Sequence, residues 1–426
     1  MQILRKQLSD TRVQLSIDAD ETQLNGAKRF VLQRVNVKVP GFRAGKAPLH
    51  LVEKYADQAR LQTDFLDAAI NDMYSKTIER EKIRPVSTPD VTIKKFVPFT
   101  TLEIDVSVDV IGPIKLADYK SIRLQKEPVT VGAADVKEVL ETLQGRIAKR
   151  EEKKQAIAKG DEVVLDFDGS DTKTGEAIQG AQGKDYPLTI GSGTFIPGFE
   201  DHLIGLKPGD NKSFSIIFPA DYGVKALQKR DVTFDVRINK VFSLTLPKLD
   251  DDFAAQAGPF KTLADLKADI KKQLTVEREE QAARNFENTL IEKIVEQSTI
   301  TPPASLVEQE IDRMENDERQ NLTYRGQTWQ EHLKDEGVTE AEHREQKRAV
   351  ASNRVKAGLL LSEIAEQENI TVTPEDLEIR MQLLKGQYKD KLMQAELDKP
   401  ENQKDILSRM VTEKTVLRLV SLASKG

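Results

Sequence analysis

Eight consecutive residues near the N-terminus combine the features of an exposed contact loop: Gly41-Phe42-Arg43-Ala44-Gly45-Lys46-Ala47-Pro48. The glycines permit a tight turn, Phe42 offers an apolar contact, and Arg43 and Lys46 carry positive charge. The surrounding stretch from Thr22 to Val52 contains no acidic residue and six basic ones: Lys28, Arg29, Arg34, Lys38, Arg43 and Lys46. Because an excess of one charge sign attracts the other, the pattern predicts a polyanionic partner bound at this one place.

Two other interpretations of the basic stretch compete with this one. A run of charge is often only a solvated face, and that alternative stays open. A phosphate-binding loop is disfavoured, because the spacing of Gly41, Gly45 and Lys46 is one residue short of G-x-x-x-x-G-K-[ST]. Ala47 also stands where that motif needs a hydroxyl for magnesium.

The octapeptide fits the G-F-R-x-G-K-x-P signature of the trigger factor family, the ribosome-associated chaperones of bacteria. This resemblance implies that the loop docks beside the ribosomal exit tunnel, against ribosomal protein and RNA. The residues that the resemblance assigns to ribosome binding are Gly41, Phe42, Arg43, Gly45 and Lys46. Ala44 stands where many members carry Lys, so one positive charge of the loop is absent here.

Aromatic residues make up only 5% of the chain, yet they gather between about residues 158 and 242. They lie in short segments: Phe167-Asp168-Gly169, Tyr186-Pro187-Leu188, Gly191-Ser192-Gly193-Thr194-Phe195-Ile196-Pro197-Gly198-Phe199-Glu200, Phe218-Pro219-Ala220-Asp221-Tyr222-Gly223, and Phe234. Pattern alone is also compatible with the core of a small β-barrel. Frequent glycines and short strand patterns predict a β-rich domain in either case.

The order of these segments resembles the FKBP-type peptidyl-prolyl isomerases, whose I-P-G-F-E segment follows a G-x-G and precedes F-P-x-x-Y-G. The resemblance implies a proline pocket without an acid or base, lined by Phe167, Tyr186, Ile196, Phe199, Tyr222 and Phe234. Ile178 stands where trigger factors usually have Phe, and Gln179 where an acidic residue is common. These departures are where rate or preference for the residue before proline is expected to differ.

An aromatic pocket can catalyse this isomerisation without proton transfer. Rotation about an X-Pro bond meets a barrier of about 18–20 kcal/mol, which arises from amide resonance. The twisted amide has lost that resonance and its charge separation, so an apolar pocket favours it over the planar form. Stronger binding of the twisted form is catalysis.

The side chains present argue against catalysis by cysteine and against a metal site. The chain has no cysteine, which excludes disulfides, thiolate catalysis and zinc–thiolate sites. Its four histidines are scattered, at His50, His202, His332 and His343, and no H-E-x-x-H is present. We therefore expect neither a metal site nor a cofactor.

Composition limits the size and location of the protein. A chain of 426 residues is too long for one ordinary core, so two to four domains are expected. The formal net charge is -6, yet residues 1–60 hold 11 Lys and Arg against 6 Asp and Glu. The N-terminus lacks the apolar segment of a secretory signal, and no run is apolar enough to span a membrane. A cytosolic protein without membrane contact is expected.

Hydrophobic periodicity predicts an α+β multidomain chain. Alternation at residues 13–17 and 102–110 indicates strands, and the spacing of Leu61, Phe65, Ala69 and Met73 indicates a helix between them. Residues after Leu246-Pro247 read as almost wholly helical, with a long helix from Leu263, a break at Thr301-Pro302-Pro303 and a helix opening at Pro374. Apolar stripes at residues 359–364 and at Leu417 with Val420 are candidate surfaces for unfolded clients.

Four parts are predicted: an N-terminal α+β ribosome-binding domain (1–112), a linker (113–157), a small β-rich FKBP-like domain (158–242) and an elongated all-α chaperone domain (243–426). The resemblance covers essentially the whole chain and implies that the helical part forms a cradle for nascent chains. It also implies roles in protein export and cell division, and a possible homodimer off the ribosome.

The sequence favours a ribosome-docked chaperone that holds nascent chains and carries a prolyl isomerase. Two alternatives remain. One is a free cytosolic isomerase whose helical region only dimerises it, and the other is a nucleic-acid-binding protein that uses the basic N-terminal face. The docking signature argues against the first, and the confinement of positive charge to one region weakens the second.

Overall fold

The computed structural model describes residues 1–43, 46–222 and 227–424, apart from the side chain of Gln179. It divides into two compact units. Unit 1 comprises Met1–Gln125, Glu287–Gly326 and Ala341–Gly426, and unit 2 comprises Lys126–Phe286 and Gln327–Glu340. The predicted α+β class is confirmed, because antiparallel sheets occur in the first 245 residues and helices alone after them.

Unit 1 begins with a four-stranded antiparallel sheet in the order β1-β2-β4-β3. The strands are β1 (Gln2–Ser9), β2 (Arg12–Asp20), β3 (Asp90–Val97) and β4 (Thr101–Asp109). The alternating residues of β2 and β4 are buried, as the sequence predicted, and Leu15 pairs with Val106 across the two strands. The edge strands β1 and β3 are largely exposed, and neither was predicted.

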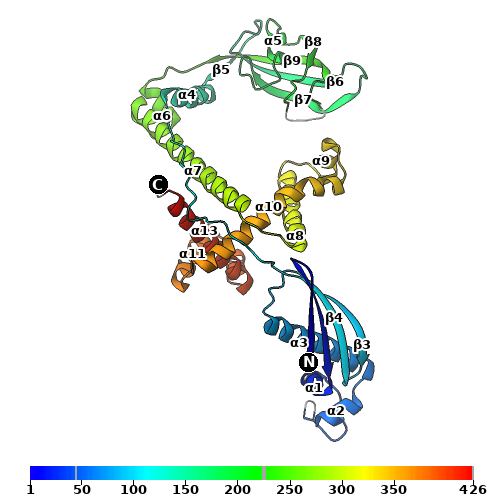
Figure 1. Cartoon of the computed structure of the whole chain (residues 1–426). Helices are drawn as coiled ribbons and strands as arrows, with labels where there is room; N and C mark the ends of the chain where they lie inside the picture. The colour runs from blue at the N-terminus through cyan, green and yellow to red at the C-terminus, as the bar shows by residue number, and fades with distance from the viewer. Residues whose placement is uncertain (44–45, 223–226, 425–426) are drawn as a thin grey trace. The chain divides into compact units, whose positions relative to one another are not determined.

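Three helices accompany this sheet: α1 (Glu21–Arg34), α2 (Leu49–Tyr55) and α3 (Gln58–Glu81). Helices α1 and α3 cover the apolar face of the sheet, as the ribbon shows (Figure 1). Phe65 of α3 is fully buried against Phe96 and Phe99, with ring centroids 6.3 and 4.8 Å away. The predicted helix stripe of Leu61, Phe65, Ala69 and Met73 is therefore the side of α3 that faces the core.

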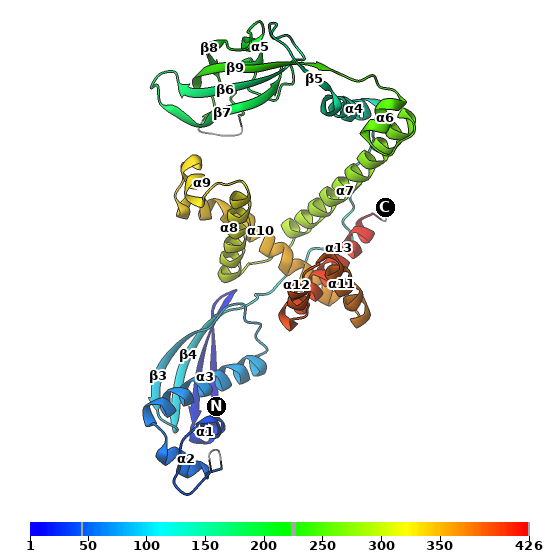
Figure 2. The same ribbon diagram turned by 180° about the vertical axis from the view of Figure 1, so that it is seen from behind.

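The helical part of unit 1 contains the end of α7 (Leu263–Gln297), then α8 (Ala304–Tyr324), α10 (Glu340–Gln367), α11 (Pro374–Gln387), α12 (Lys391–Leu397) and α13 (Pro400–Ala423). As predicted, the Pro302-Pro303 break separates α7 from α8 and α11 begins with Pro374 in its first turn; Thr373 is its N-cap. Helices α8 and α10 pack through Ile311 and Ala351, both fully buried. Figure 2 shows α11 to α13 from behind.

Unit 2 contains a five-stranded antiparallel sheet formed by β5 (Lys149–Glu152), β6 (Glu162–Asp171), β7 (Ala177–Thr189), β8 (Asn211–Ile217) and β9 (Asp231–Thr245). The order is β5-β9-β6-β7, and β8 also pairs with β9. Helix α5 (Phe199–Leu203) follows β7. One core, centred on residues such as Phe199 and Phe234, fills the space beneath the sheet.

The remaining helices of unit 2 are α4 (Ala133–Ile147), α6 (Asp251–Ala257), the first part of α7 and α9 (Trp329–Glu336). Helices α4, α6 and α7 share a small core around Leu140, Phe253 and Leu266. Arg278 of α7 binds Asp135 at the start of α4, with nitrogen–oxygen distances of 2.6 and 3.2 Å. Within the described residues, no helix has the length and apolarity that crossing a membrane requires.

Candidate active site and docking loop

The six residues predicted to line a proline pocket all come from the sheet of unit 2 and its connections. Phe167 lies on β6, Tyr186 on β7, Phe199 at the start of α5 and Phe234 on β9. Ile196 lies between β7 and α5, and Tyr222 follows β8. The long strand β9 holds β8 on one side and β6 on the other, which brings Phe234 level with Phe214 and Gly169.

Phe167 is the centre of an aromatic cluster. Its ring centroid lies 5.7 Å from that of Tyr186 in an edge-to-face arrangement, and 6.2 and 6.4 Å from those of Phe199 and Phe234. The rings of Phe199 and Phe234 are 5.2 Å apart, also edge to face. These separations are those of favourable aromatic pairs. The structure thus joins four of the six predicted residues in one cluster, in which Phe167 contacts each of the other three.

Tyr222 joins the cluster indirectly. Its ring lies 4.8 Å from Phe218, which lies 6.4 Å from Phe234. Ile196 is half-buried and packs against the same core. Tyr186 is 40% exposed, whereas Phe199 has no exposed surface, so the predicted residues range from fully buried to open.

Three aromatic residues of this cluster were not predicted: Phe214 of β8, which contacts Phe199 and Phe234, and two that stand inside the motif segments. Phe218 links Tyr222 to Phe234, and Phe195 packs against Phe167, Tyr186 and Phe199. The signal that could have found them is their aromatic character within the two motif segments. Spacing could not, because Phe195 lies in a connection whose course depends on glycine torsion angles.

The connection between β7 and α5 is anchored by a buried carboxylate. Glu200 accepts hydrogen bonds from the backbone N–H of Gly191 at 2.5 Å and from the hydroxyl of Ser192 at 3.2 Å. Gly193 and Gly198 have φ of 67° and 90°, values that other residues adopt at a cost. Glu200 therefore fixes the start of this connection next to the aromatic cluster.

Hydrogen bonds also hold an irregularity within the β6–β7 pair and the turn that joins the two strands. Asp166 accepts from the backbone N–H of Asp185 at 2.7 Å and from Asn239 at 2.9 Å, which positions the residue before Tyr186. At the turn, Asp171 accepts from the N–H groups of Thr174 and Lys173. These bonds lower the pKa of the Asp171 carboxyl. Ile178 is buried in the core, and the side chain of Gln179 lies outside the described residues.

The octapeptide joins α1 to α2. Its base is packed, since Val39 is buried and Ala47 contacts the small core around Val31, Val52 and Leu61. Its tip is open: Gly41 has a φ of 84°, Phe42 is 44% exposed, and Arg43 and Lys46 are exposed. Gly45, which was also predicted to bind the ribosome, lies outside the described residues.

Positive charge around this loop is mostly uncompensated. Lys28 pairs with Glu53 at 2.8 Å and lies over the ring of Phe99. The guanidinium of Arg34 lies over the exposed ring of Phe30, 4.5 Å from its centroid. Within the described part of the chain, Arg29, Arg34, Lys38, Arg43 and Lys46 form no ion pair. The loop therefore presents an apolar tip together with free cations.

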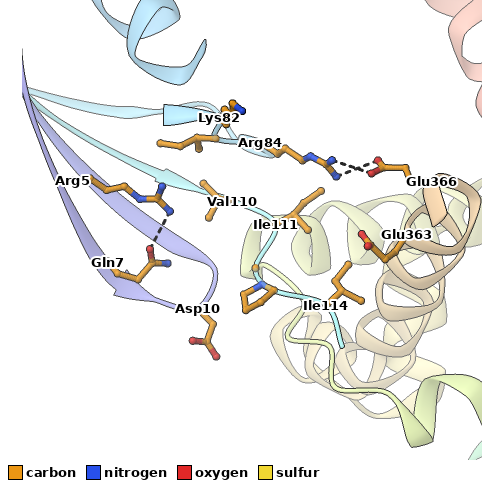
Figure 3. Close-up of a pocket in the computed structure, with 13 residues that line it drawn as sticks. Arg5, Gln7, Asp10, Lys82, Arg84, Val110, Ile111, Ile114, Glu363 and Glu366 are labelled. Atoms are coloured by element: carbon orange, nitrogen blue, oxygen red, sulfur yellow. Dashed lines mark hydrogen bonds and ion pairs between the residues drawn. The ribbon is translucent and has the colours of Figure 1, made fainter. Parts of the chain in front are cut away.

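A cleft of about 610 Å³ lies elsewhere in unit 1, between the sheet and α10 (Figure 3). Arg84 and Glu366 bridge it through two hydrogen bonds of 3.2 and 3.0 Å, and this contact raises the pKa of Arg84. Gly112 is required on its wall, because an added Cβ would lie 2.6 Å from the carbonyl oxygen of Asp10. Charges of both signs line the cleft and partly neutralise each other.

The segment after β4 is held to the helices of unit 1 by Glu368, just beyond the end of α10. Glu368 accepts from the hydroxyl of Tyr119 at 3.0 Å, and it pairs with Lys120 at 2.6 Å and Arg418 at 3.1 Å. These contacts, that of Lys120 foremost, lower the pKa of Glu368 to about 2. Burial and the bond to Glu368 raise the pKa of Tyr119 to about 12.

Of the two apolar stripes predicted to face clients, one is buried and the other is partly exposed. Leu359, Leu360, Leu361 and Ile364 are buried, so this stripe belongs to the core and the expectation that it faces clients was wrong. Leu417 of α13 is 63% exposed. Other apolar residues are also exposed, including Leu383 of α11 (64%) and Leu392 of α12 (79%). Much of the exposed apolar surface of the helical part therefore lies on α11 to α13, while Val276, Tyr324 and Val350 are exposed on α7, α8 and α10.

The histidines are not gathered around the aromatic cluster. His50 is exposed, and the ring of His202 stacks on Phe214 with centroids 4.5 Å apart. His343 is buried, with its Nδ1 3.4 Å from Glu315. The aromatic cluster in a five-stranded sheet instead agrees with the class of domain that the sequence indicated, a prolyl isomerase domain within a larger protein.

Comparison with known proteins agrees with this class and defines the family. Residues 153–239 match the family model described as FKBP-type peptidyl-prolyl cis-trans isomerase. Residues 1–143 match Bacterial trigger factor protein (TF), and residues 262–421 match its C-terminus.

Curated relatives match over most of the chain. The trigger factor of Halothermothrix orenii is 32% identical over 90% of this chain and 89% of its own, and that of Geobacillus thermodenitrificans is 35% identical over 88% of each. That of Clostridium botulinum (strain Hall) is 33% identical over 97% of this chain and 96% of its own. The chain belongs to the trigger factor family.

Membership in this family defines the general function. The protein is a ribosome-associated chaperone that binds nascent chains, and it carries an FKBP-type peptidyl-prolyl cis–trans isomerase domain. A solved structure described as "Promiscuous Substrate Recognition in Folding and Assembly Activities of the Trigger Factor Chaperone" covers 99% of both chains, with 20% identity and a TM-score of 0.48.

Proposed function

We propose that Phe42, Arg43 and Lys46, with Gly41 and Gly45 shaping their loop, dock this protein on ribosomal protein and RNA beside the exit tunnel. The observation that carries the proposal is an exposed phenylalanine between free cations, on a loop whose base is buried. RNA phosphates attract Arg43 and Lys46, and Phe42 supplies an apolar contact that a merely solvated charged face would not have. The cytoplasm, where ribosomes reside, is the proposed location.

Co-sedimentation with ribosomes at several salt concentrations tests this docking. The triple substitution of Phe42, Arg43 and Lys46 by Ala removes the apolar tip and two cations, so binding is expected to fall at least about 10-fold. If both cations contact phosphates, the dependence of log K on log salt becomes shallower by about 2.

A matched control for the triple substitution is replacement of Lys389, Lys391 and Leu392 by Ala. Like the loop variant, this set removes two exposed cations, Lys389 and Lys391, and one exposed apolar residue, since Leu392 is 79% exposed. Equal loss of ribosome binding in both triple variants, or undiminished binding by the folded loop variant, would reject the assignment.

We also propose that Phe167, Tyr186, Ile196, Phe199, Tyr222 and Phe234 form the proline site of the isomerase. Support comes from the contacts of Phe167 with three of them and from the absence of any need for an acid or base. Tyr186 and Tyr222, at the open side of the cluster, are then the residues that meet the peptide around its proline. The twisted X-Pro amide is stabilised because the aromatic surroundings favour the less polar form.

The proposed division of the chain assigns docking to residues 1–112, the connection to 113–157, isomerisation to 158–242 and client holding to 243–426. Exposed Leu383, Leu392 and Leu417 support the last assignment, because weak multi-point contact with unfolded segments needs apolar surface in solvent. Self-association off the ribosome is a further part of the proposal, and sedimentation equilibrium of the free protein tests it.

A further inference from the structure

Phe195 packs against Phe199 more closely than any other two described rings pack. Their centroids are 4.0 Å apart and the ring planes are inclined by 36°, so the two faces are nearly stacked. Phe195 also lies 5.2 Å from Phe167, edge to face, and 5.9 Å from Tyr186. Its ring thus sits among three of the residues proposed to surround the proline.

This position leaves the inner residues of the site without a free surface. Phe199 is 0% exposed, Phe234 1% and Phe167 6%. A side chain that packs on a ligand must present surface to it, so a proline ring cannot reach Phe199 in this conformation. Phe195 is itself only half-buried, which leaves its outer side facing solvent. It covers the site from outside.

The segment that carries Phe195 is suited to move while its flanks stay in place. Gly193 and Gly198 bracket it with φ of 67° and 90°, and a Cβ added to either would meet nothing within 4 Å. Phe195 makes no backbone hydrogen bond to another described residue. Gly191 and Ser192, which precede the segment, are bound to Glu200. Phe195 itself lies between two residues of the segment that are tied to its ends: Thr194 bonds to the hydroxyl of Ser192, and the carbonyl of Ile196 accepts from the N–H of Phe199.

We propose that Phe195 occupies the place of the prolyl ring in the free enzyme, and that its displacement is part of substrate binding. This inference rests on the proline site proposed above. The covered conformation competes with the peptide, because apparent affinity falls in proportion to the fraction of enzyme that can bind. Phe195 thereby lowers the apparent affinity of the site for a proline-containing peptide. It also favours peptides in which the residue next to proline can take over the contacts that Phe195 makes with Tyr186.

The test is to measure binding and catalysis together in the full-length protein. Isomerisation leaves the peptide covalently unchanged, so the Kd of a short proline-containing tetrapeptide can be measured calorimetrically at equilibrium. A protease-coupled assay on the same peptide gives kcat/KM. Phe195→Ala removes the competing ring, so Kd is expected to fall about 3- to 10-fold and kcat/KM to rise by a similar factor.

Tyr186→Ala, assayed in parallel, separates failure of this inference from failure of the proposed site. If Tyr186→Ala weakens binding and Phe195→Ala does so too, Phe195 is an ordinary contact residue and the inference is overturned while the site stands. The same holds if Phe195→Ala changes nothing. If neither substitution changes Kd or kcat/KM, the site itself is misassigned and the inference falls with it.

A second variant guards against loss of folding in Phe195→Ala. Phe195→Leu keeps an apolar side chain but removes the ring that stacks on Phe199, so tighter binding in the same direction is expected. Circular dichroism melting of each variant shows whether the module is folded. Weaker binding by a folded Phe195→Leu protein would overturn the proposal by itself.

Discussion

The aromatic residues of the proposed proline site differ in how far a peptide can reach them. Phe199 and Phe234 are buried, so truncating either removes core packing and mixes lost stability with lost binding. Tyr186 is 40% exposed and touches the cluster only at the ring of Phe167 and the covering ring of Phe195. It is therefore the residue at which a role in binding can be separated from a role in folding.

Tyr186→Ala is expected to lower kcat/KM for a proline-containing tetrapeptide about 3- to 10-fold, because an aromatic contact of this kind is worth about 0.5–1.5 kcal/mol beyond the area it buries. The melting temperature should hardly change. Tyr388→Ala is the matched control, since Tyr388 is also 40% exposed and lies outside the module. A loss of activity of the same size in both variants would contradict the assignment.

Sequence reasoning reached most of this site but not its covering residue. Phe167, Tyr186, Phe199 and Phe234 could be predicted because their motif segments are specific and their strands are regular. Phe195 could not be assigned, because its ring position depends on the positive φ of Gly193 and Gly198, which residue spacing does not reveal. The apolar stripe at Leu359 to Leu361 shows the opposite error, since periodicity marks a buried face and an exposed one alike.

The segment that leaves β4 is attached to the helices by backbone hydrogen bonds and by one carboxylate. Lys115 pairs with Thr299 through backbone hydrogen bonds, and the N–H of Ala117 binds the hydroxyl of Ser298 at 2.9 Å. Glu368 adds three side-chain partners, Tyr119, Lys120 and Arg418. The Glu368 side chain is only 11% exposed, whereas Lys120 and Arg418 are 59% and 44% exposed, so the contacts are shielded from solvent on the carboxylate side alone.

Glu368→Gln is expected to lower the free energy of unfolding by about 1–3 kcal/mol at neutral pH, because hydrogen bonds to a charged group are lost. Glu366→Gln is the control: Glu366 is 53% exposed with Arg84 as its partner, so about 0–1 kcal/mol is expected. Urea unfolding followed by circular dichroism measures both. A loss no larger for Glu368 than for Glu366 would count against the fastening role.

The same pair predicts a pH dependence with a definite sign. The pKa of Glu368 falls from 4.5 to about 2 in the folded protein, so its contribution is complete above pH 4.5 and disappears as the pH drops towards 2. The stability difference between the wild type and Glu368→Gln should therefore shrink across that interval. A difference that stays constant from pH 5 to pH 2.5 would contradict the lowered pKa.

Elements with an apolar period were the predictable ones. The strands β2 and β4, the helix α3 and the break between α7 and α8 follow from alternation, helical spacing and prolines. The strands β1 and β3 were missed because both lie at the edges of the sheet and expose most side chains. Strand β5 was missed because its four residues, Lys149–Glu152, are all charged and exposed, and only pairing with β9 makes them a strand.

Along the whole chain, the isomerase module (β5 to β9, residues 149–245) is inserted so that its two ends are adjacent. Lys149 at the start of β5 pairs with Thr245 at the end of β9, so the two ends of the module lie side by side. Insertions of this kind can be removed with a short linker, because the flanking chain ends are already close. Client holding and isomerisation are therefore expected to be separable, with holding supplied by the apolar residues exposed on α11 to α13.

Light scattering during dilution of an unfolded client, one whose folding is not limited by proline isomerisation, tests this division most directly. A variant with residues 149–245 replaced by a short Gly-Ser linker should still suppress aggregation. The variant with Leu383, Leu392 and Leu417 changed to Ser should lose most protection yet keep its isomerase activity. Ile217→Ser, which alters a 67% exposed residue of the module, is the control and should protect like the wild type. If protection disappears with the module and survives the three serines, the helical region is not the client-holding surface and the account is wrong.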